Sequence, residues 1–208
     1  SRRPRTAAAV EWVDVPAWTE EHGVYESPDL GTIVQEVVDR PGWTAGNALV
    51  VMILGTGKRV AESYDGEPGL VPMLHVEYGG QGAPTATPTA TGTATATATE
   101  TGAPTSTATP TGTASPSPTA TGSGTSVPGS SLEVPVMQYD DDAEEDFASG
   151  QVALRGWDLE LGEDRDPQAV GLRFQGLDIP QGATITRAYV AFRADELHSG
   201  ATDLTFYG

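Results

Sequence analysis

The sequence predicts an all-β protein, a β-sandwich with one short helix at about residues 28–39 and an extended low-complexity linker. Short runs of alternating apolar and polar residues, bounded by Gly, Pro and Asp, recur in the first 80 or so residues and again in the last 80 or so. Such runs are typical of strands. Only one stretch has apolar residues at helical spacing. Between them, residues 84–125 contain neither Val, Ile, Leu nor any aromatic residue, so this part cannot build a core.

We therefore divide the chain into residues 1–79, a linker at 80–128, and residues 129–208. The tract at 84–125 holds 17 Thr, 4 Ser and 6 Pro in 42 residues. Ser/Thr-rich tracts with Pro are typical of mucin-like stalks, and we expect covalent O-glycans here; the alternative is an unmodified flexible linker. The candidate glycosylation sites are Thr85, Thr87, Thr89, Thr91, Thr93, Thr95, Thr97, Thr99, Thr101, Thr105, Thr107, Thr109, Thr111, Thr113, Thr119 and Thr121.

The first part combines the helix with several strands. Ser27 followed by Pro28 and Asp29 predicts a helix N-terminus, and the helix must end before Pro41. A strand is expected at 6–13. Three further runs, 48–54, 59–64 and 73–78, predict a three-stranded antiparallel meander, with Gly55 to Gly57 as a hairpin turn.

The last part predicts strands only. Its candidate strands are residues 132–137, 151–154, 169–174, 184–194 and 202–207. The clearest alternation follows the turn at Pro180 to Gly182, after which apolar residues recur along one face. Two β-rich parts on either side of a linker are consistent with a sandwich.

Composition excludes several functions. A formal net charge of -18 argues against a nucleic-acid partner, because phosphates must be neutralised by clustered Lys and Arg. The longest apolar run, residues 48–54, is far shorter than the about 20 residues of a membrane-spanning helix. The absence of Cys removes thiolate chemistry and disulfides. No zinc-binding His pair, serine-nucleophile motif or Walker motif is present, so we expect no enzyme.

The densest charge cluster is a candidate metal site. The run from Asp140 to Asp146 contains six carboxylates, and Ca²⁺ binds six to eight oxygen ligands. The alternative is a solvated, self-repelling loop without a metal. The candidate calcium ligands are Asp140, Asp142, Glu144 and Glu145.

Aromatic residues suggest a second kind of site. Trp12 and Trp18 are candidates for a platform that stacks on sugar rings, although such residues also fill sandwich cores. Trp43 and Trp157 are expected in the core. His75 alternates with Leu74 and Val76 and is expected to face outward.

Residues 178–192, with the sequence D-I-P-Q-G-A-T-I-T-R-A-Y-V-A-F, resemble the first strands of DNRLRE-type jelly-roll modules, relatives of secreted carbohydrate-binding modules. Residues 27–78, with S-P-D-L at 27–30 and H-V-E-Y at 75–78, are similar to the last part of the same modules in large bacterial extracellular surface proteins. The resemblance implies a jelly-roll sandwich and, in some relatives, a structural calcium. It also implies that the two halves stand in swapped order around the linker.

Each half alone would expose an apolar sheet face and open strand edges. Either the linker lets the halves of one chain combine, or the last half of one copy pairs with the first half of the next. We favour the second arrangement, in which copies or adjacent repeats form an extracellular fibre by β-strand complementation. The expected function is structural and adhesive, on the cell surface. The alternative is a carbohydrate-binding module of a secreted polysaccharide-active enzyme, with an extracellular polysaccharide as ligand.

Overall fold

The computed structural model describes residues 5–81, which we call the leading segment, and residues 129–208, the trailing segment. The leading segment contains β1 (Val10–Trp12), β2 (Val24–Glu26), α1 (Gly31–Val38), β3 (Asn47–Thr56), β4 (Lys58–Glu62) and β5 (Met73–Gln81). The trailing segment contains β6 (Ser130–Pro135), β7 (Asp142–Asp146), β8 (Val152–Ala153), β9 (Asp158–Gly162), β10 (Gln168–Leu177), β11 (Ala183–Arg193) and β12 (Asp203–Tyr207). The predicted all-β class with one short helix is confirmed.

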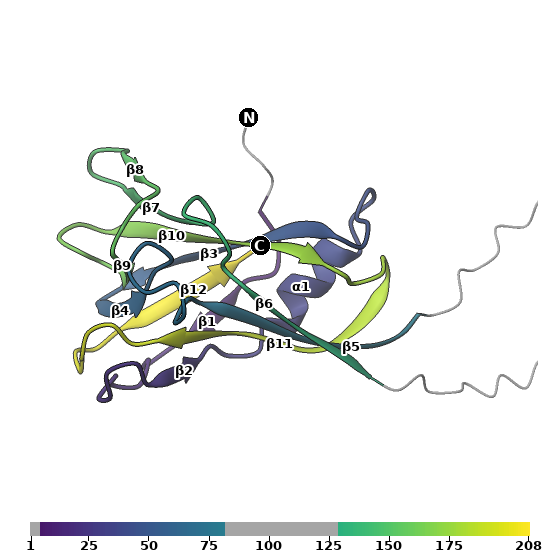
Figure 1. Cartoon of the computed structure of the whole chain (residues 1–208), viewed down its shortest axis with the longest axis horizontal. Coiled ribbons are helices and arrows are strands. Elements are labelled where there is room, and N and C mark those ends of the chain that lie inside the picture. The colour runs from purple at the N-terminus through teal and green to yellow at the C-terminus, as the bar shows by residue number, and fades with distance from the viewer. Residues whose placement is uncertain (1–4, 82–128) are drawn as a thin grey trace, which may run out of the picture. The chain divides into compact units, whose positions relative to one another are not determined.

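The strands form two facing sheets and a small third one (Figure 1). One sheet has the order β1-β12-β3-β10-β7-β8, the second β2-β11-β5-β6, and β4 pairs with β9 alone. Among the described residues, no helix has the length and apolar character that crossing a bilayer requires.

The two segments are interleaved in all three sheets. Seven of the nine strand pairings join a strand of the leading segment to one of the trailing segment, and the other two lie within the trailing segment. In the described part of the chain, no strand of the leading segment pairs with another strand of that segment. The leading segment therefore obtains its strand partners entirely from the trailing segment of the same chain, which is the first of the two arrangements considered above, not the favoured one.

The predicted meander is wrong for this reason. Its three runs are strands β3, β4 and β5, but each belongs to a different sheet. Gly57, with φ +74°, is not the turn of a hairpin; it carries the chain from one sheet to another. A Cβ at Gly57 would clash with the carbonyl oxygen of Ala201, so this passage requires glycine.

One continuous core fills the space between the large sheets. Alternate residues of β3 and β10, among them Val51, Ile53 and Leu172, are fully buried, as are Leu74 of β5 and Phe192 of β11. Alternation with period two places these side chains on one face of each strand. The core is therefore shared by the two segments in the same way as the sheets.

Helix α1 is also hydrogen-bonded to the trailing segment. The expected apolar positions Ile33, Val34, Val37 and Val38 are buried, but the helix begins at Gly31 rather than near residue 28. The amide of Gln35 donates to the carbonyl of Ala183 at 2.9 Å and its oxygen accepts from the N–H of Ile185 at 2.8 Å.

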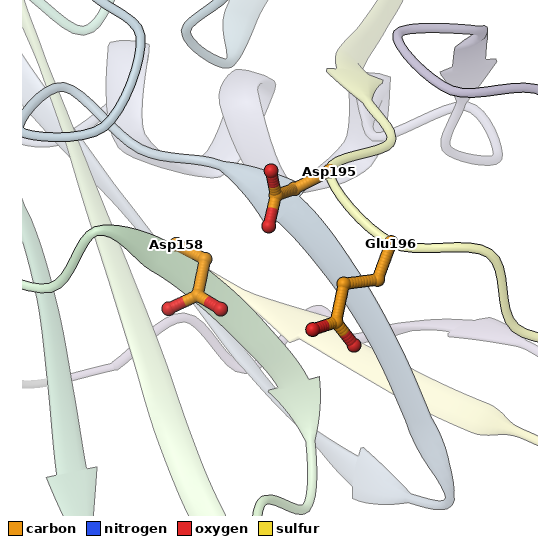
Figure 2. Close-up of side chains that lie close together, drawn as sticks. All are labelled: Asp158, Asp195 and Glu196. Carbon is orange, nitrogen blue, oxygen red and sulfur yellow. The ribbon is translucent and has the colours of Figure 1, made fainter.

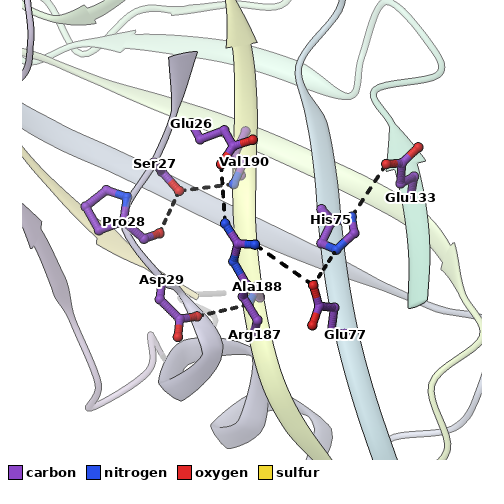
Figure 3. A network of polar contacts seen from close by, with 10 residues as sticks. All are labelled: Glu26, Ser27, Pro28, Asp29, His75, Glu77, Glu133, Arg187, Ala188 and Val190. Atoms are coloured by element: carbon purple, nitrogen blue, oxygen red, sulfur yellow. Dashed lines mark hydrogen bonds and ion pairs between the residues drawn. The ribbon is translucent and has the colours of Figure 1, made fainter. Parts of the chain in front are cut away.

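Ser27 does not cap the helix as predicted, whereas Asp29 accepts the N–H of Gly31, the first helical residue, at 2.9 Å. The hydroxyl of Ser27 accepts a hydrogen bond from the N–H of Val190, and a carboxylate oxygen of Asp29 accepts one from the N–H of Ala188 (Figure 3). Both side chains thus satisfy backbone donors of β11 and extend its pairing beyond β2. The Ser27 oxygen is therefore used by a strand donor instead of a helix donor, while the same Asp29 oxygen accepts both the helix start and the strand.

Arg59 is a second buried polar residue that hydrogen-bonds to both segments, and 1% of its surface is exposed. Its guanidinium donates to the carbonyls of Val15, Pro16, Lys58 and Gly200 and to the hydroxyl of Thr202. Because the planar group spreads its donors over both segments, it joins the loop after β1 and the start of β4 to the turn before β12.

Candidate functional site

The predicted calcium ligands do not come together. Asp142 to Asp146 form strand β7, which pairs with β10, so successive side chains point to opposite faces. Glu145 is exposed, whereas Glu144 on the other face is partly buried. Asp142 is 4% exposed and accepts the N–H of Tyr64 at 2.9 Å. Asp140 lies before the strand, in an ion pair with Arg173 at 3.1 Å.

The prediction of a calcium site at Asp140, Asp142, Glu144 and Glu145 is therefore not supported by the arrangement of these residues. Within residues 5–81 and 129–208, the four carboxylates do not form a group whose oxygens could meet on one ion. Asp140 and Asp142 have protein partners instead, since Asp140 pairs with Arg173 and Asp142 accepts the N–H of Tyr64. Asp141, which is 2% exposed, accepts from Arg173 and from the amide of Gln175.

Glu144 is held in an unusual environment. Its Oε1 accepts the N–H of Glu160 at 2.7 Å and the amide of Gln168 at 3.1 Å. Burial raises the pKa of Glu144 to about 8, and the nearby carboxylates of Glu160 and Asp158 add to the effect. Lys58 supplies a counter-charge, since its Nζ lies 3.6 Å from Glu160. The group is thus a protonated carboxyl near neutral pH.

A different acidic group gathers where β9 meets the loop after β11. Asp158, Asp195 and Glu196 each offer an oxygen, and these oxygens lie within 4.8 Å of one another (Figure 2). Burial, followed by neighbouring carboxylates, raises the pKa of both Asp158 and Asp195. The electrostatic repulsion between three carboxylates this close can be relieved by protonation of one of them or by a bound cation. The trio is assembled from distant parts of the trailing segment, so only the adjacency of Asp195 and Glu196 was visible in the sequence.

The burial of the tryptophans differs from expectation: two candidates for an exposed platform are buried, and one expected in the core is exposed. Trp12 is 9% exposed and Trp18 1%, so neither offers a ring face for a sugar, and their interpretation as a sugar platform is wrong. Trp18 stacks instead on Tyr25, with ring centroids 4.9 Å apart. Trp43 is buried as predicted, with its Nε1 donating to the carbonyl of Ile179. Trp157, expected in the core, is 79% exposed.

The outer face of the four-stranded sheet carries a groove. It has a volume of about 370 Å³, and every strand of that sheet contributes to it. The lining combines apolar side chains with a few charged ones. It consists of Val24, Glu26, Pro68, Gly69, Val71, Met73, His75, Glu133, Pro135, Tyr189, Ala191 and Arg193.

A polar network organises one side of this groove (Figure 3). The Nε2 of His75 lies 3.3 Å from Glu77, and its Nδ1 lies 3.5 Å from Glu133 on the neighbouring strand. The imidazole stacks on Tyr189 with centroids 4.7 Å apart, and the guanidinium of Arg187 lies 4.6 Å from the centre of the same ring. His75 faces outward as predicted, between buried Leu74 and Val76.

The chemistry of the groove is that of binding. It offers carboxylate acceptors, an imidazole, a guanidinium and a phenol beside apolar carbon, which are the groups that hold a polar ligand by hydrogen bonds and contact. In sequence these residues are spread over β2, β5, β6 and β11. Only the strand alternation around His75 indicated any of them.

The remaining predicted sites lie outside the described residues. All sixteen candidate glycosylation threonines, from Thr85 to Thr121, fall within residues 82–128.

Comparison of the chain with protein-family models, with curated proteins and with solved structures produced no match.

Glu144 gives a pH-dependent prediction. Because its pKa is raised in the folded state, the unfolded chain loses the proton first, and stability falls as pH rises from about 4.5 to about 8. Replacing Glu144 with Gln keeps an acceptor for the Glu160 N–H and removes the ionisation. After allowance for solvent screening, we expect Glu144→Gln to abolish about 1–2 kcal/mol of the loss between pH 6 and pH 9.

Urea unfolding at the two pH values measures this difference. Glu145→Gln, at the exposed neighbouring position, is the matched control and should leave the loss unchanged. Equal losses in Glu144→Gln and the parent chain would show that Glu144 is ordinarily ionised.

Proposed function

We propose that the protein is a structural and adhesive module of an extracellular surface protein, and that copies assemble into a fibre by β-strand complementation. The observation that carries this proposal is that each strand of the leading segment is paired only with strands of the trailing segment. A trailing segment from another copy presents the same strands and the same core face. Exchange between copies therefore preserves each pairing without new contacts.

The linker makes such exchange sterically accessible. Residues 82–128 connect β5 to β6, which pair side by side from Met73–Pro135 to Tyr78–Ser130. A chain of 47 residues reaches up to roughly 160 Å when extended, far more than the β5–β6 turn needs. In the proposed fibre the Thr/Pro-rich tract carries O-glycans and stands out from each sandwich as a stalk. The net charge of -18 keeps the protein soluble, because neighbouring molecules repel one another.

The resemblance to DNRLRE-type modules supports the same proposal. In those modules the strands corresponding to residues 178–192 come first, and the part corresponding to residues 27–78 comes last. The two segments of this chain are then complementary halves of one sandwich, which agrees with their interleaving in both large sheets.

Disulfide trapping tests exchange directly, because the parent chain has no Cys. Glu11 on β1 lies opposite Thr205 on β12, and directly opposed residues in an antiparallel pair are close enough for a disulfide. We co-express one chain carrying Glu11→Cys with another carrying Thr205→Cys. Exchange predicts a covalent heterodimer on oxidation, visible on a non-reducing gel.

Two controls accompany this experiment. Glu20→Cys is exposed but has no partner on β12, so its co-expression with Thr205→Cys should give only background dimer. Both Cys in one chain should form an internal disulfide in any closed monomer. Heterodimer at the background level, together with an efficient internal disulfide, would contradict fibre assembly.

A second candidate function, binding of an extracellular polysaccharide, is favoured by the groove on the outer face of the four-stranded sheet. Sugar rings have apolar C–H faces and a rim of hydroxyls, which suit Met73 and Ala191 next to His75 and Glu133. In this function the groove replaces the Trp12 and Trp18 platform.

Retention on insoluble polysaccharides tests the second candidate. The double variant His75→Ala and Tyr189→Ala should weaken retention about tenfold, because it removes two groups that line the groove. Tyr139→Ala is the control, since Tyr139 is an exposed aromatic outside the groove. Absence of saturable retention in the parent chain, or equal loss in the control, would eliminate this candidate.

A further inference from the structure

The two ends of the described chain meet beside the sheet that contains β1 and β12. The N–H of Thr6 donates to the carbonyl of Gly208 at 2.7 Å, and the N–H of Gly208 donates to the hydroxyl of Thr6 at 2.8 Å. From there β1 and β12 run antiparallel, with Val10 opposite Phe206. The arrangement is that of the two arms of a hairpin.

Packing fixes this meeting point. A Cβ at Gly208 would lie 2.7 Å from Ile33 and 3.2 Å from Val37, so Gly208 sits tightly against helix α1. The carboxylate of Glu36 accepts the N–H groups of Ala7 and Ala8 at 2.9 Å each. Both arms are therefore positioned by the same helix.

A peptide bond from Gly208 to Ser1 would close this hairpin with a loop of only five residues, Ser1 to Arg5. Five residues lie within the usual range for a β-hairpin connection. The existing connection between the segments, by contrast, runs through the 47 residues 82–128 at the β5–β6 side. The sandwich thus has two places at which its segments can be joined.

The two connections differ in cost. The free-energy cost of closing a loop grows as (3/2)RT times the logarithm of the number of residues in it. The closure equilibrium therefore favours a loop of five residues over one of 47 by about 30-fold. Neither connection changes any strand pairing, because each only joins neighbouring strand ends. The shorter connection is the one that favours folding.

We propose that, where copies of this chain follow one another head to tail, the trailing segment of one copy folds with the leading segment of the next, across the Gly208–Ser1 joint. The partner is a second copy of this chain, and the Thr/Pro-rich tract becomes the spacer between neighbouring sandwiches. This inference rests on the complementarity of the two segments, as the proposed function also does, and adds the side of the fold through which segments of neighbouring copies are joined.

A circular permutant that keeps all 208 residues tests the inference. It begins at Pro104 inside the tract, continues through Gly208 into Ser1, and ends at Ala103. The sandwich is then connected only through the short joint. We expect the same far-ultraviolet circular dichroism as the parent chain, a thermal midpoint at least as high, and refolding about tenfold or more faster, in line with the shorter loop.

A second permutant without Ser1 to Arg5 is the control. Gly208 would then precede Thr6 directly, and the two hydrogen bonds between these residues could not form, so its midpoint should fall below that of the first permutant. A first permutant that is unfolded or melts below the parent chain would overturn the inference, as would a deletion without effect. Failure of disulfide exchange between separate chains would overturn fibre assembly and leave this result unaffected.

Discussion

The structure depends on the pairing of leading-segment strands with trailing-segment strands. An unpaired strand in a buried position leaves its N–H and C=O groups without partners, and each such group costs about 1–3 kcal/mol. Strands β3 and β5 each lie between two strands of the trailing segment, so both of their edges would be open without it. The buried side chains follow the same division, since Val51 and Leu74 pack in a core shared with Leu172 and Phe192. Folding of this sandwich is in effect an association of two segments.

The high negative charge is accommodated by the same architecture. Some carboxylates in or next to a strand are paired with a cation on a neighbouring strand, as Asp141 is with Arg173 and Glu160 with Lys58. Where no cation is in reach, as at Glu144, burial favours the protonated form. The outer face of the four-stranded sheet keeps charged groups, among them Glu26, Glu133 and Arg193, around a groove.

Local patterns identified most of the elements but not their partners. The apolar spacing at Ile33 to Val38 located the helix, and alternation located β3, β5, β10, β11 and β12 to within a few residues. Pairing was mispredicted because β3, β4 and β5 all find their partners in the trailing segment, on the far side of the linker, and no local signal encodes such pairing. The prediction that each half needs a counterpart came from counting strands, which is a global argument.

The candidate sites were harder to predict for a related reason. The acidic run at Asp142 to Asp146 has the composition of a loop, yet its pairing with β10 makes it strand β7. Trp157 and Trp18 are equal in type, and only the sheet packing decides that one is exposed and the other buried. The groove and the trio of Asp158, Asp195 and Glu196 combine residues from separate strands and loops, so their proximity exists only in the folded molecule.

Circular dichroism and urea unfolding of residues 1–81 and residues 129–208, produced as separate chains and then mixed, test the central claim most directly. We predict that residues 1–81 alone show no cooperative unfolding, and that an equimolar mixture regains the β spectrum and a single cooperative transition. Cooperative unfolding of residues 1–81 by themselves would contradict the account, because it would mean that the leading segment possesses a sheet of its own.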